Sequence, residues 1–520
     1  MTISNEAYKA LEDIVGSEYI SRDPADLDSY CFVWGNELLY GDKFSPRPPA
    51  VIMPGSTEEV SAIVKTCNRF GLKYRAHASG FEVAALSSDT PFIPIDLRRM
   101  NRIVEIDAKN RIAVVEPYVS QLKLFLETRK VGLRPLMLSS GPSCSVASGT
   151  AAHYGSGASN ISTDYGARNL LGAEWVLPNG DIIKLGSLGS SGEWINADGP
   201  GPSLRGVLRG YGGANGGNGI FTKIATKIYP WYGQAKPMYP YEIPENFDAH
   251  ILYFPDINKI NDFTQLLYEA SIAYHFQRFP AGGVFLMATE SNDETYALLQ
   301  NIPQDMMDAI GTHGATVAID ASSKEEMEYK RKVLNKIIEE TEANELPIDE
   351  TQMGVLYHHV LTGGGILKLA FRPTGSFMIT GTGDEAMDSM GILGREAWDK
   401  IVSPLYSAGA VFNAAPYACW AVQYGEGSGH VESLVQYDPA SSESVNTAVE
   451  QFGKADHIVA EMGFSINSLE NALSYNESAL KAAMPYVPVD FVKYMKMIKR
   501  AIDPNNSSDP AFYVSPDEWE

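Results

Sequence analysis

Hydrophobic and polar positions in the first part of the chain predict a mixture of strands and helices. The apolar run Val51–Met53 predicts a strand, and Ser56 followed by acidic residues predicts the start of a helix. Apolar residues recur at helical spacing up to Gly71, which predicts the helix end. Apolar runs at 92–97 and 113–117 predict further strands. This order indicates an α+β arrangement.

Small residues dominate the segment from 131 to 233, which is dense in Gly, Ser, Ala and Asn. A flexible linker would have a similar composition, but strand-like runs at 173–177 and 221–228 interrupt the segment. Glycine allows the backbone to approach another group closely. We therefore interpret these glycines as positions where the chain approaches a bound ligand.

A change in composition near residue 231 indicates a second domain. After it, strand-like runs alternate with helices, one of which begins with a capping pattern at Ser323. The tail contains one helix through Tyr494–Ile502, followed by Asp503-Pro504-Asn505-Asn506. The predicted division is a helical lead-in at 1–45, a first domain at 46–233, a second domain at 234–465 and a C-terminal segment at 466–520.

Composition and charge exclude several classes of function. The 520 residues include 41 Lys and Arg against 64 Asp and Glu, a formal net charge of −23, so no affinity for nucleic acid is expected. A hydrophobic share of 44% excludes a largely disordered chain. No run approaches the roughly 18 apolar residues of a membrane span, and the N-terminus lacks a signal-peptide pattern. These features predict a cytoplasmic protein without a membrane span.

The cysteine and histidine patterns predict no metal site. Cys31, Cys67, Cys144 and Cys419 are far apart in sequence, which excludes linear zinc and iron–sulfur motifs. We expect His358-His359 on an extended segment, where neighbouring side chains point to opposite faces and would not chelate one ion. A metal-dependent hydrolase that uses histidines of the second domain is therefore the least favoured class.

Two Gly/Ser-rich stretches carry the main chemical signal. Backbone N–H groups, helix N-termini and small hydroxyls hold a diphosphate best, and Ser140–Ser145 together with Ser148–Thr150 supplies all three. The chain has no Walker A motif and no Gly-x-Gly-x-x-Gly within a compact βαβ unit. Their absence disfavours a P-loop hydrolase and a simple NAD site.

Six motifs, in order, resemble those of the vanillyl-alcohol oxidase / p-cresol methylhydroxylase superfamily of FAD enzymes. They are Pro54–Val60, Ile95–Asn101, Val115–Pro117, the central set Ser148–Thr150, Tyr165–Gly166 and Glu174–Asp181, then Gly217–Thr222, and Ile498–Asn506. The resemblance covers residues 46–233 and 485–510. It implies an α+β fold: a PCMH-type FAD-binding domain of two α+β subdomains, plus an α+β cap domain with an antiparallel sheet. The tail would return to the FAD domain.

The resemblance also implies where the cofactor binds. The implied FAD-binding residues are Arg75, His77, Ala78, Ser79, Gly80, Phe81, Pro142, Ser143, Ser145, Val146, Ser148, Gly149, Thr150, Gly155, Tyr165, Gly166, Gly219, Ile220 and Asn505. The tyrosine that tethers flavin in p-cresol methylhydroxylase would fall near Leu369-Ala370, and His77 is displaced from the histidine that other members attach to flavin. A non-covalent FAD is therefore implied.

Three residues are implied for the chemistry. His153 would lie near the reactive N5 edge of the flavin, where an imidazole suits proton transfer near neutral pH; the alternative is a histidine that only braces its Gly-rich loop. His430 would face the substrate from the cap or lie at the surface. Arg372 would bind an anionic substrate group or form a surface ion pair.

The resemblance implies an FAD-linked oxidase or dehydrogenase. It would move a hydride from a small organic substrate (alkylphenol-like, alcohol or hydroxy acid) to flavin N5, and pass electrons to oxygen, a cytochrome or an electron-transfer flavoprotein. A homodimer is implied as well. The alternative is a flavin-binding electron-relay subunit with little substrate chemistry of its own. The motifs do not name the substrate.

Overall fold

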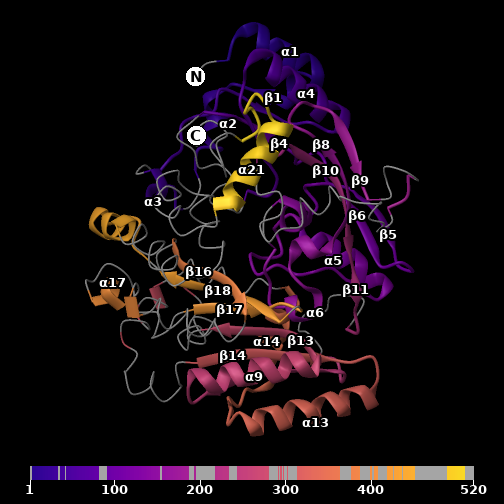
Figure 1. Ribbon diagram of the computed structural model, residues 1–520, viewed down its shortest axis with the longest axis vertical. Coiled ribbons are helices and arrows are strands. Elements are labelled where there is room, and N and C mark those ends of the chain that lie inside the picture. Colours follow the sequence, from indigo (N-terminus) through magenta and orange to yellow (C-terminus); the bar gives the residue numbers. More distant parts are fainter. Residues whose placement is uncertain are drawn as a thin grey trace.

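The computed structural model places the two ends of the chain in one half of the molecule and a large sheet in the other (Figure 1). It describes residues 3–32, 35–40, 43–80, 91–152, 155–186, 192–194, 217–233, 243–279, 313–362, 378–386, 419–425, 427–435, 437–450 and 489–509, with some single residues and short stretches between them. Following the sequence prediction, we call the half with the chain ends the FAD domain and the other half the cap.

The first subdomain contains a four-stranded sheet of order β1-β2-β4-β3. Its elements are α1 (Asn5–Val15), β1 (Ile20–Ser21), α2 (Pro24–Asp28), α3 (Asn36–Tyr40), β2 (Val51–Ile52), α4 (Thr57–Phe70), β3 (Tyr74–His77) and β4 (Ile93–Asp96). The helix predicted after Ser56 is confirmed, because the Ser56 hydroxyl accepts a hydrogen bond from the Glu59 amide at 3.1 Å. Gly71 ends α4 in the left-handed conformation.

The second subdomain contains a five-stranded antiparallel sheet of order β5-β6-β10-β8-β9. Its elements are β5 (Ile103–Asp107), β6 (Ile112–Val115), α5 (Gln121–Thr128), β7 (Leu133–Arg134), α6 (Asn160–Thr163), β8 (Leu170–Val176), β9 (Ile182–Leu185), β10 (Ile220–Lys227) and β11 (Tyr229–Pro230). Trp175 and Phe221 stack with ring centroids 5.5 Å apart in its core.

The cap is built on a seven-stranded sheet of order β15-β12-β14-β13-β17-β18-β16. Its elements are β12 (Phe247–Phe254), α9 (Ile257–Ala270), β13 (Ala273–Phe279), β14 (His313–Asp320), α13 (Lys324–Glu340), β15 (Asn344–Glu345), α14 (Glu350–Thr362), β16 (Met378–Ala386), α17 (Ser403–Ser407), β17 (Cys419–Gln423) and β18 (Ser428–Val435). The strand pairings described in this sheet are all antiparallel, as predicted.

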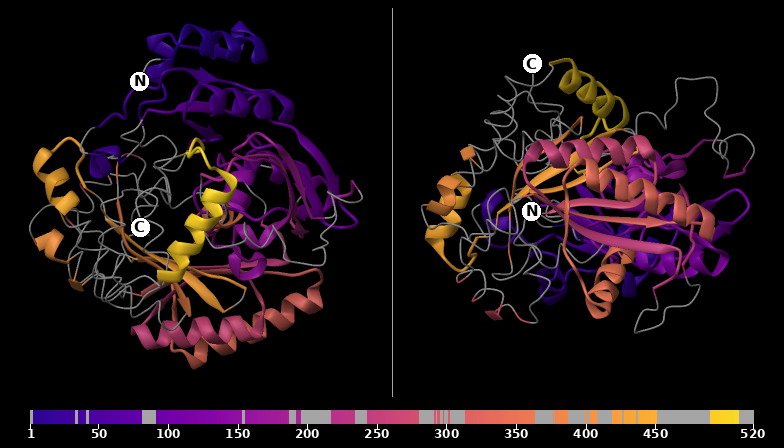
Figure 2. Two further views of the ribbon diagram at one scale, coloured as in Figure 1. Left: turned by 45° about the horizontal axis from the view of Figure 1, so that its top comes forward. Right: turned by 90° about the horizontal axis from the view of Figure 1, so that it is seen from below.

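The cap sheet has two unlike faces. Helices α9 and α13 lie side by side over one face, as the view from below shows (Figure 2, right). The main core of the cap is on this side, where Phe263 and Leu334 from these helices pack against Val431 of the sheet. Because side chains alternate along a strand, the neighbours of Val431 in β18 project from the opposite face.

Two local expectations have different outcomes. Ser323 caps α13, since its hydroxyl accepts a hydrogen bond from the Glu326 amide at 3.2 Å, as predicted. The extended segment expected for His358-His359 is wrong, because both residues lie in α14. His359 is buried against the sheet while His358 is exposed, so packing of one helix face determines their orientation.

The ends of the chain connect the two halves. Helix α1 packs on α4 through Leu11 and Val15, whereas Leu38 of α3 joins the core of the cap. The Tyr437 hydroxyl of the cap donates a hydrogen bond to Glu37 at 2.6 Å. Helix α21 (Val489–Ile502) returns to the FAD domain, between the two subdomains (Figure 2, left).

Candidate active site

The loop after β3 is anchored by a buried arginine. Arg75 donates from Nε to the Asp509 carboxylate, and its guanidinium lies 4.2 Å from the centroid of the Phe92 ring. These contacts hold the first residue of the predicted FAD loop, which continues through Ala78 to Gly80. Phe81, also predicted to bind FAD, lies outside the described residues.

His77 is a partly buried imidazole at the start of this loop. Its ring lies edge-on to Tyr30 with centroids 5.6 Å apart. Burial lowers the pKa of His77, so the ring is neutral near pH 7. Its Nδ1 atom is buried without a hydrogen-bond partner among the described residues. A Cβ on Gly80 would lie 2.5 Å from Cε1 of the ring, so glycine is needed for the loop to close over His77.

A polar contact joins the loops of the two subdomains. The Ser145 amide donates to the Ser79 hydroxyl at 3.1 Å, and the Ser145 hydroxyl donates to the Pro117 carbonyl at 2.6 Å. The Ser148 amide in turn donates to the Ser145 hydroxyl at 3.0 Å. The structure thus brings together two Ser-rich stretches that are 66 residues apart in sequence.

The other predicted residues of the second loop lie around this contact. Pro142 accepts a hydrogen bond from the Leu122 amide, and the Val146 amide donates to Val119, both at 2.9 Å. Ser143 is exposed. Thr150 is buried within a short π-helical turn, Ser148–Ala152.

Three predicted glycines, at positions 149, 155 and 166, meet at one point. A Cβ on Gly166 would lie 1.7 Å from the Gly149 carbonyl oxygen, and a Cβ on Gly155 would lie 2.1 Å from the same atom. The Gly166 amide donates to the Gly155 carbonyl at 3.0 Å. From the sequence, we interpreted these glycines as positions where the chain approaches a ligand. At Gly155 and Gly166, the atoms that lie this close belong to the protein backbone instead. The glycines therefore shape the loops themselves.

Tyr424 connects the cap to these loops. Its hydroxyl lies 3.0 Å from the Ser156 hydroxyl, and its ring is 5.2 Å from that of Tyr165, a predicted FAD residue. The Tyr424 amide donates to the Ser428 carbonyl at 2.8 Å and so closes the β17–β18 hairpin. His153, in the same glycine-rich loop, lies outside the described residues, as does Arg372.

His430 is a fully buried residue of β18, not a surface histidine. Its Nε2 lies 2.7 Å from Oε1 of Glu432, which is also buried. The two side chains share the face opposite Val431, and Ser428 at the Tyr424 hairpin lies on that face too. The His–Glu pair therefore projects from the side of the sheet that meets the FAD domain.

Gln277 was missed by the sequence analysis. In β13 it pairs with Val422, which pairs with His430, so the three form one row across the sheet. The Gln277 side chain is buried, and Nε2 has no hydrogen-bond partner among the described residues. The sequence did contain a signal for this residue, a glutamine inside the strand-like stretch Tyr274–Phe279. When a strand buries such a side chain, its amide needs polar partners.

The remaining predicted FAD residues lie near the tail. Gly219 has a φ of +97°, and Ile220 begins β10 in a buried position. Asn505 donates from Nδ2 to Asn68 at 2.8 Å and is exposed.

No set of three His, Cys, Asp or Glu side chains within the described ranges is grouped as metal ligands would be. No helix in the described part of the chain is both long enough and apolar enough to cross a bilayer.

These residues fit a dinucleotide. Small hydroxyls and main-chain groups come from both subdomains at the Ser79–Ser145 contact. Beside it, the buried Nδ1 atom of His77 has no hydrogen-bond partner in the described part of the chain. Side chains this small leave room for phosphates to approach the backbone. Ser79, Gly80, Ser145 and Ser148 would hold the diphosphate of FAD there.

Comparison with known proteins points to the same cofactor. Residues 48–186 match the family described as FAD binding domain. An uncharacterized FAD-linked oxidoreductase of Mycobacterium tuberculosis is 29% identical over 184 residues, 35% of this chain and 39% of that protein. The flavoprotein subunit of 4-cresol dehydrogenase (hydroxylating) from Pseudomonas putida is 28% identical over 264 residues, 48% of this chain and 47% of the subunit. The chain thus spans less than half the length of these relatives.

Solved structures of similar fold align with nearly the full length of the chain. p-Cresol methylhydroxylase with substrate bound is similar with a TM-score of 0.77 over 99% of this chain and 98% of that chain, at 18% identity. 4-Ethylphenol oxidase from Gulosibacter chungangensis, in an isoeugenol complex, has a TM-score of 0.74 over 99% and 98% of the two chains, at 20% identity. Residues 48–186 therefore form an FAD binding domain, and the chain has the fold of p-cresol methylhydroxylase and 4-ethylphenol oxidase.

Proposed function

We propose that the protein oxidises a small organic substrate held between a bound FAD and the cap sheet. The flavin would accept a hydride at N5 and pass the electrons to a second acceptor. The observation that carries this proposal is the buried His430–Glu432 pair, on the sheet face that meets the FAD-domain loops. A buried base with an orienting carboxylate is costly to maintain in a core, and is typical of reactive sites.

The chain's own groups have separate roles in this proposal. His430 takes a proton from a substrate O–H or N–H, because an imidazole exchanges protons readily near neutral pH. Glu432 orients the ring through its contact with Nε2. Gln277, in the same row of the sheet, donates to a substrate oxygen from Nε2, which has no hydrogen-bond partner among the residues that the structure describes. Tyr424 closes the site against Ser156 and limits access of water.

Other parts of the proposal rest on the family resemblance. His153 and Arg372 remain candidates for proton transfer and anion binding. The electron acceptor would be oxygen, a cytochrome or an electron-transfer flavoprotein, and the protein would form a homodimer in the cytoplasm. 4-Cresol dehydrogenase and glycolate oxidase are among the relatives, so alkylphenols, alcohols and hydroxy acids are the substrates to test first.

A substrate panel tests the proposal. The purified protein is expected to show the visible spectrum of bound flavin, and one class of the panel is expected to bleach it under anaerobic conditions. A preparation that stays colourless after addition of FAD would contradict the assignment. Reduction of the flavin by a partner protein alone, and by no small molecule, would favour the electron-relay alternative.

Acid precipitation tests the flavin linkage. We expect free FAD in the supernatant, since the neutral His77 ring is packed between Tyr30 and Gly80 and its Nδ1 atom is buried. Yellow colour that stays with the pellet would instead show a covalent bond. In that case, His77→Ala would release the colour only if His77 is the anchor.

A further inference from the structure

The end of the chain lies along the edge of the first sheet. Strand β3 is the edge strand there, and Tyr74 forms a parallel bridge with Ser508. The Tyr74 amide donates to the Ser507 carbonyl at 3.0 Å, and the Asp509 amide donates to the Tyr74 carbonyl at 2.8 Å. The tail therefore extends the first sheet beside the start of the FAD loop.

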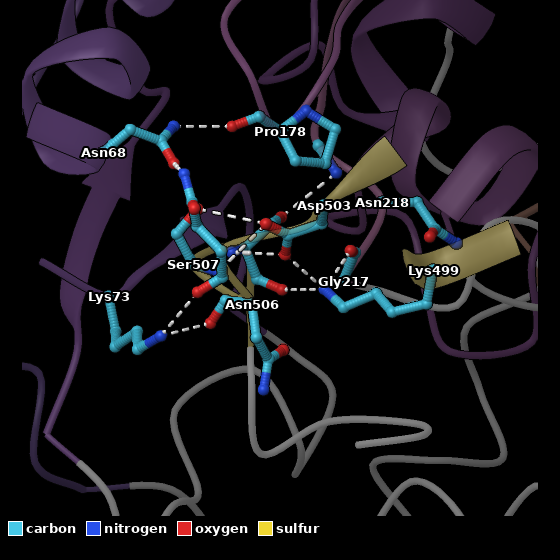
Figure 3. A network of polar contacts seen from close by, with 12 residues as sticks. Asn68, Lys73, Pro178, Gly217, Asn218, Lys499, Asp503, Asn506 and Ser507 are labelled. Atoms are coloured by element: carbon cyan, nitrogen blue, oxygen red, sulfur yellow. Dashed lines mark hydrogen bonds and ion pairs between the residues drawn. The ribbon is translucent and has the colours of Figure 1, made fainter. Parts of the chain in front are cut away.

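The same short segment also holds the second subdomain. The Gly219 amide donates to the Ser508 hydroxyl at 3.1 Å, and the Gly217 carbonyl accepts from the Lys499 ammonium group (Figure 3). Gly217 and Gly219 have φ values of +68° and +97°, a conformation that favours glycine. They lead directly into β10, the central strand of the second sheet.

Lys499 is the centre of this arrangement. Besides Gly217, its Nζ donates to Oδ2 of Asp503 and to the Ser508 carbonyl, each at 2.6 Å. These three acceptors match the three N–H donors of an ammonium group. Asp503 also accepts from the amides of Ser507 at 3.0 Å and Ser508 at 2.9 Å. Lys499 and Asp503 are both buried, so the tail cannot rearrange without exposing or breaking this ion pair.

A second contact connects the tail to the cofactor loop. Asp509 is the partner of Arg75, the residue that opens the loop from Arg75 to Gly80. The tail thus touches Arg75 in one subdomain and Gly217–Gly219 in the other. Both stretches are among those that would surround the FAD.

We propose that residues 499–509 form a clasp between the two subdomains, and that Lys499 is the positioning residue through which clasp docking and FAD binding stabilise each other. FAD would span the same two subdomains, so the clasp and the cofactor both favour the same relative position of these subdomains. Two binding events that favour one arrangement are coupled, and the coupling is reciprocal. This inference concerns retention of the cofactor and does not depend on the substrate.

Lys499→Met tests the clasp, because methionine retains the length of the side chain and removes its charge and donors. The expected result is an FAD dissociation constant raised about tenfold, the usual scale of such coupling. In the FAD-free protein, hydrogen exchange is expected to become faster at the amides of Tyr74–His77 and Ile220–Lys227. Unchanged FAD affinity and unchanged exchange in these two strands would overturn the proposal.

Two further variants separate the clasp from general destabilisation. Arg331→Met removes an ion pair to Asp248 within the cap (2.5 Å), and should leave FAD affinity unchanged. Ser508→Ala removes only the hydroxyl that receives the Gly219 amide and leaves the Lys499 network intact, so it provides the test if Lys499→Met does not fold. It should weaken FAD binding several-fold. An equal loss in Arg331→Met, or no loss in Ser508→Ala, would contradict the clasp.

Discussion

Gly166→Ala is expected to abolish FAD binding and to destabilise the protein strongly. The new Cβ would lie 1.7 Å from the Gly149 carbonyl oxygen and 2.9 Å from Cα of Gly155. Both are backbone atoms, so no side-chain rotation relieves the overlap. Overpacking costs up to about 3 kcal/mol where a core can adjust, and we expect at least about that loss in the free energy of unfolding. Denaturant titration and FAD titration measure the two effects.

Gly354→Ala is the matched control for this prediction. Gly354 lies in α14, where an added Cβ would meet nothing within 4 Å. Alanine is favoured over glycine in a helix interior by about 1 kcal/mol, so this variant should be as stable as the native protein or more stable. If Gly166→Ala bound FAD normally, the meeting point of the three glycines would not shape the cofactor site.

His430→Gln is expected to slow flavin reduction by about 100-fold or more, the usual scale for loss of a general base. Glutamine reaches roughly as far as the imidazole Nε2 and can still donate to Glu432, but it does not accept a proton near neutral pH. Anaerobic stopped-flow measurement with the reducing substrate found in the panel gives the rate. The flavin spectrum and the melting temperature should remain close to native, because glutamine can keep the hydrogen bond to Glu432.

A second histidine–glutamate pair in the same sheet provides the control. His250 of β12 lies 2.6 Å from Glu345 of β15 at the far edge of the sheet, and His250→Gln should leave the reduction rate unchanged. Native reduction kinetics in His430→Gln would remove His430 from the mechanism. His153→Ala, measured alongside, would then show whether the glycine-rich loop carries the base, as the family resemblance implies.

Much of the fold follows from local sequence signals. The hydroxyl at Ser56 and the glycine at Gly71 predict the two ends of α4, and Ser323 predicts the start of α13, because a capping side chain bonds amides only two or three residues away. By resemblance to a known family, the order of motifs around 54–60, 95–101 and 217–222 also implies an FAD domain.

The arrangement of the candidate site residues could not be predicted from local sequence signals, because it depends on how distant strands pair. His430 and Glu432 are two residues apart, but only the assignment of β18 as a strand with Val431 in the core places them on the face toward the FAD domain. Gln277 reaches the same row through two strand pairings. For His358-His359, the adjacent positions alone did not distinguish a strand from the helix that is present.

From sequence alone, the chain was assigned its cofactor class, its α+β architecture and the loops that would carry FAD. Tertiary structure alone decided that Gly149, Gly155 and Gly166 touch one another, and that Lys499 meets Gly217 across 282 residues. The physical reason is the range of the forces involved. Hydrogen bonds at turns and caps depend on neighbouring residues, whereas the partners of a buried side chain depend on how whole sheets and helices pack.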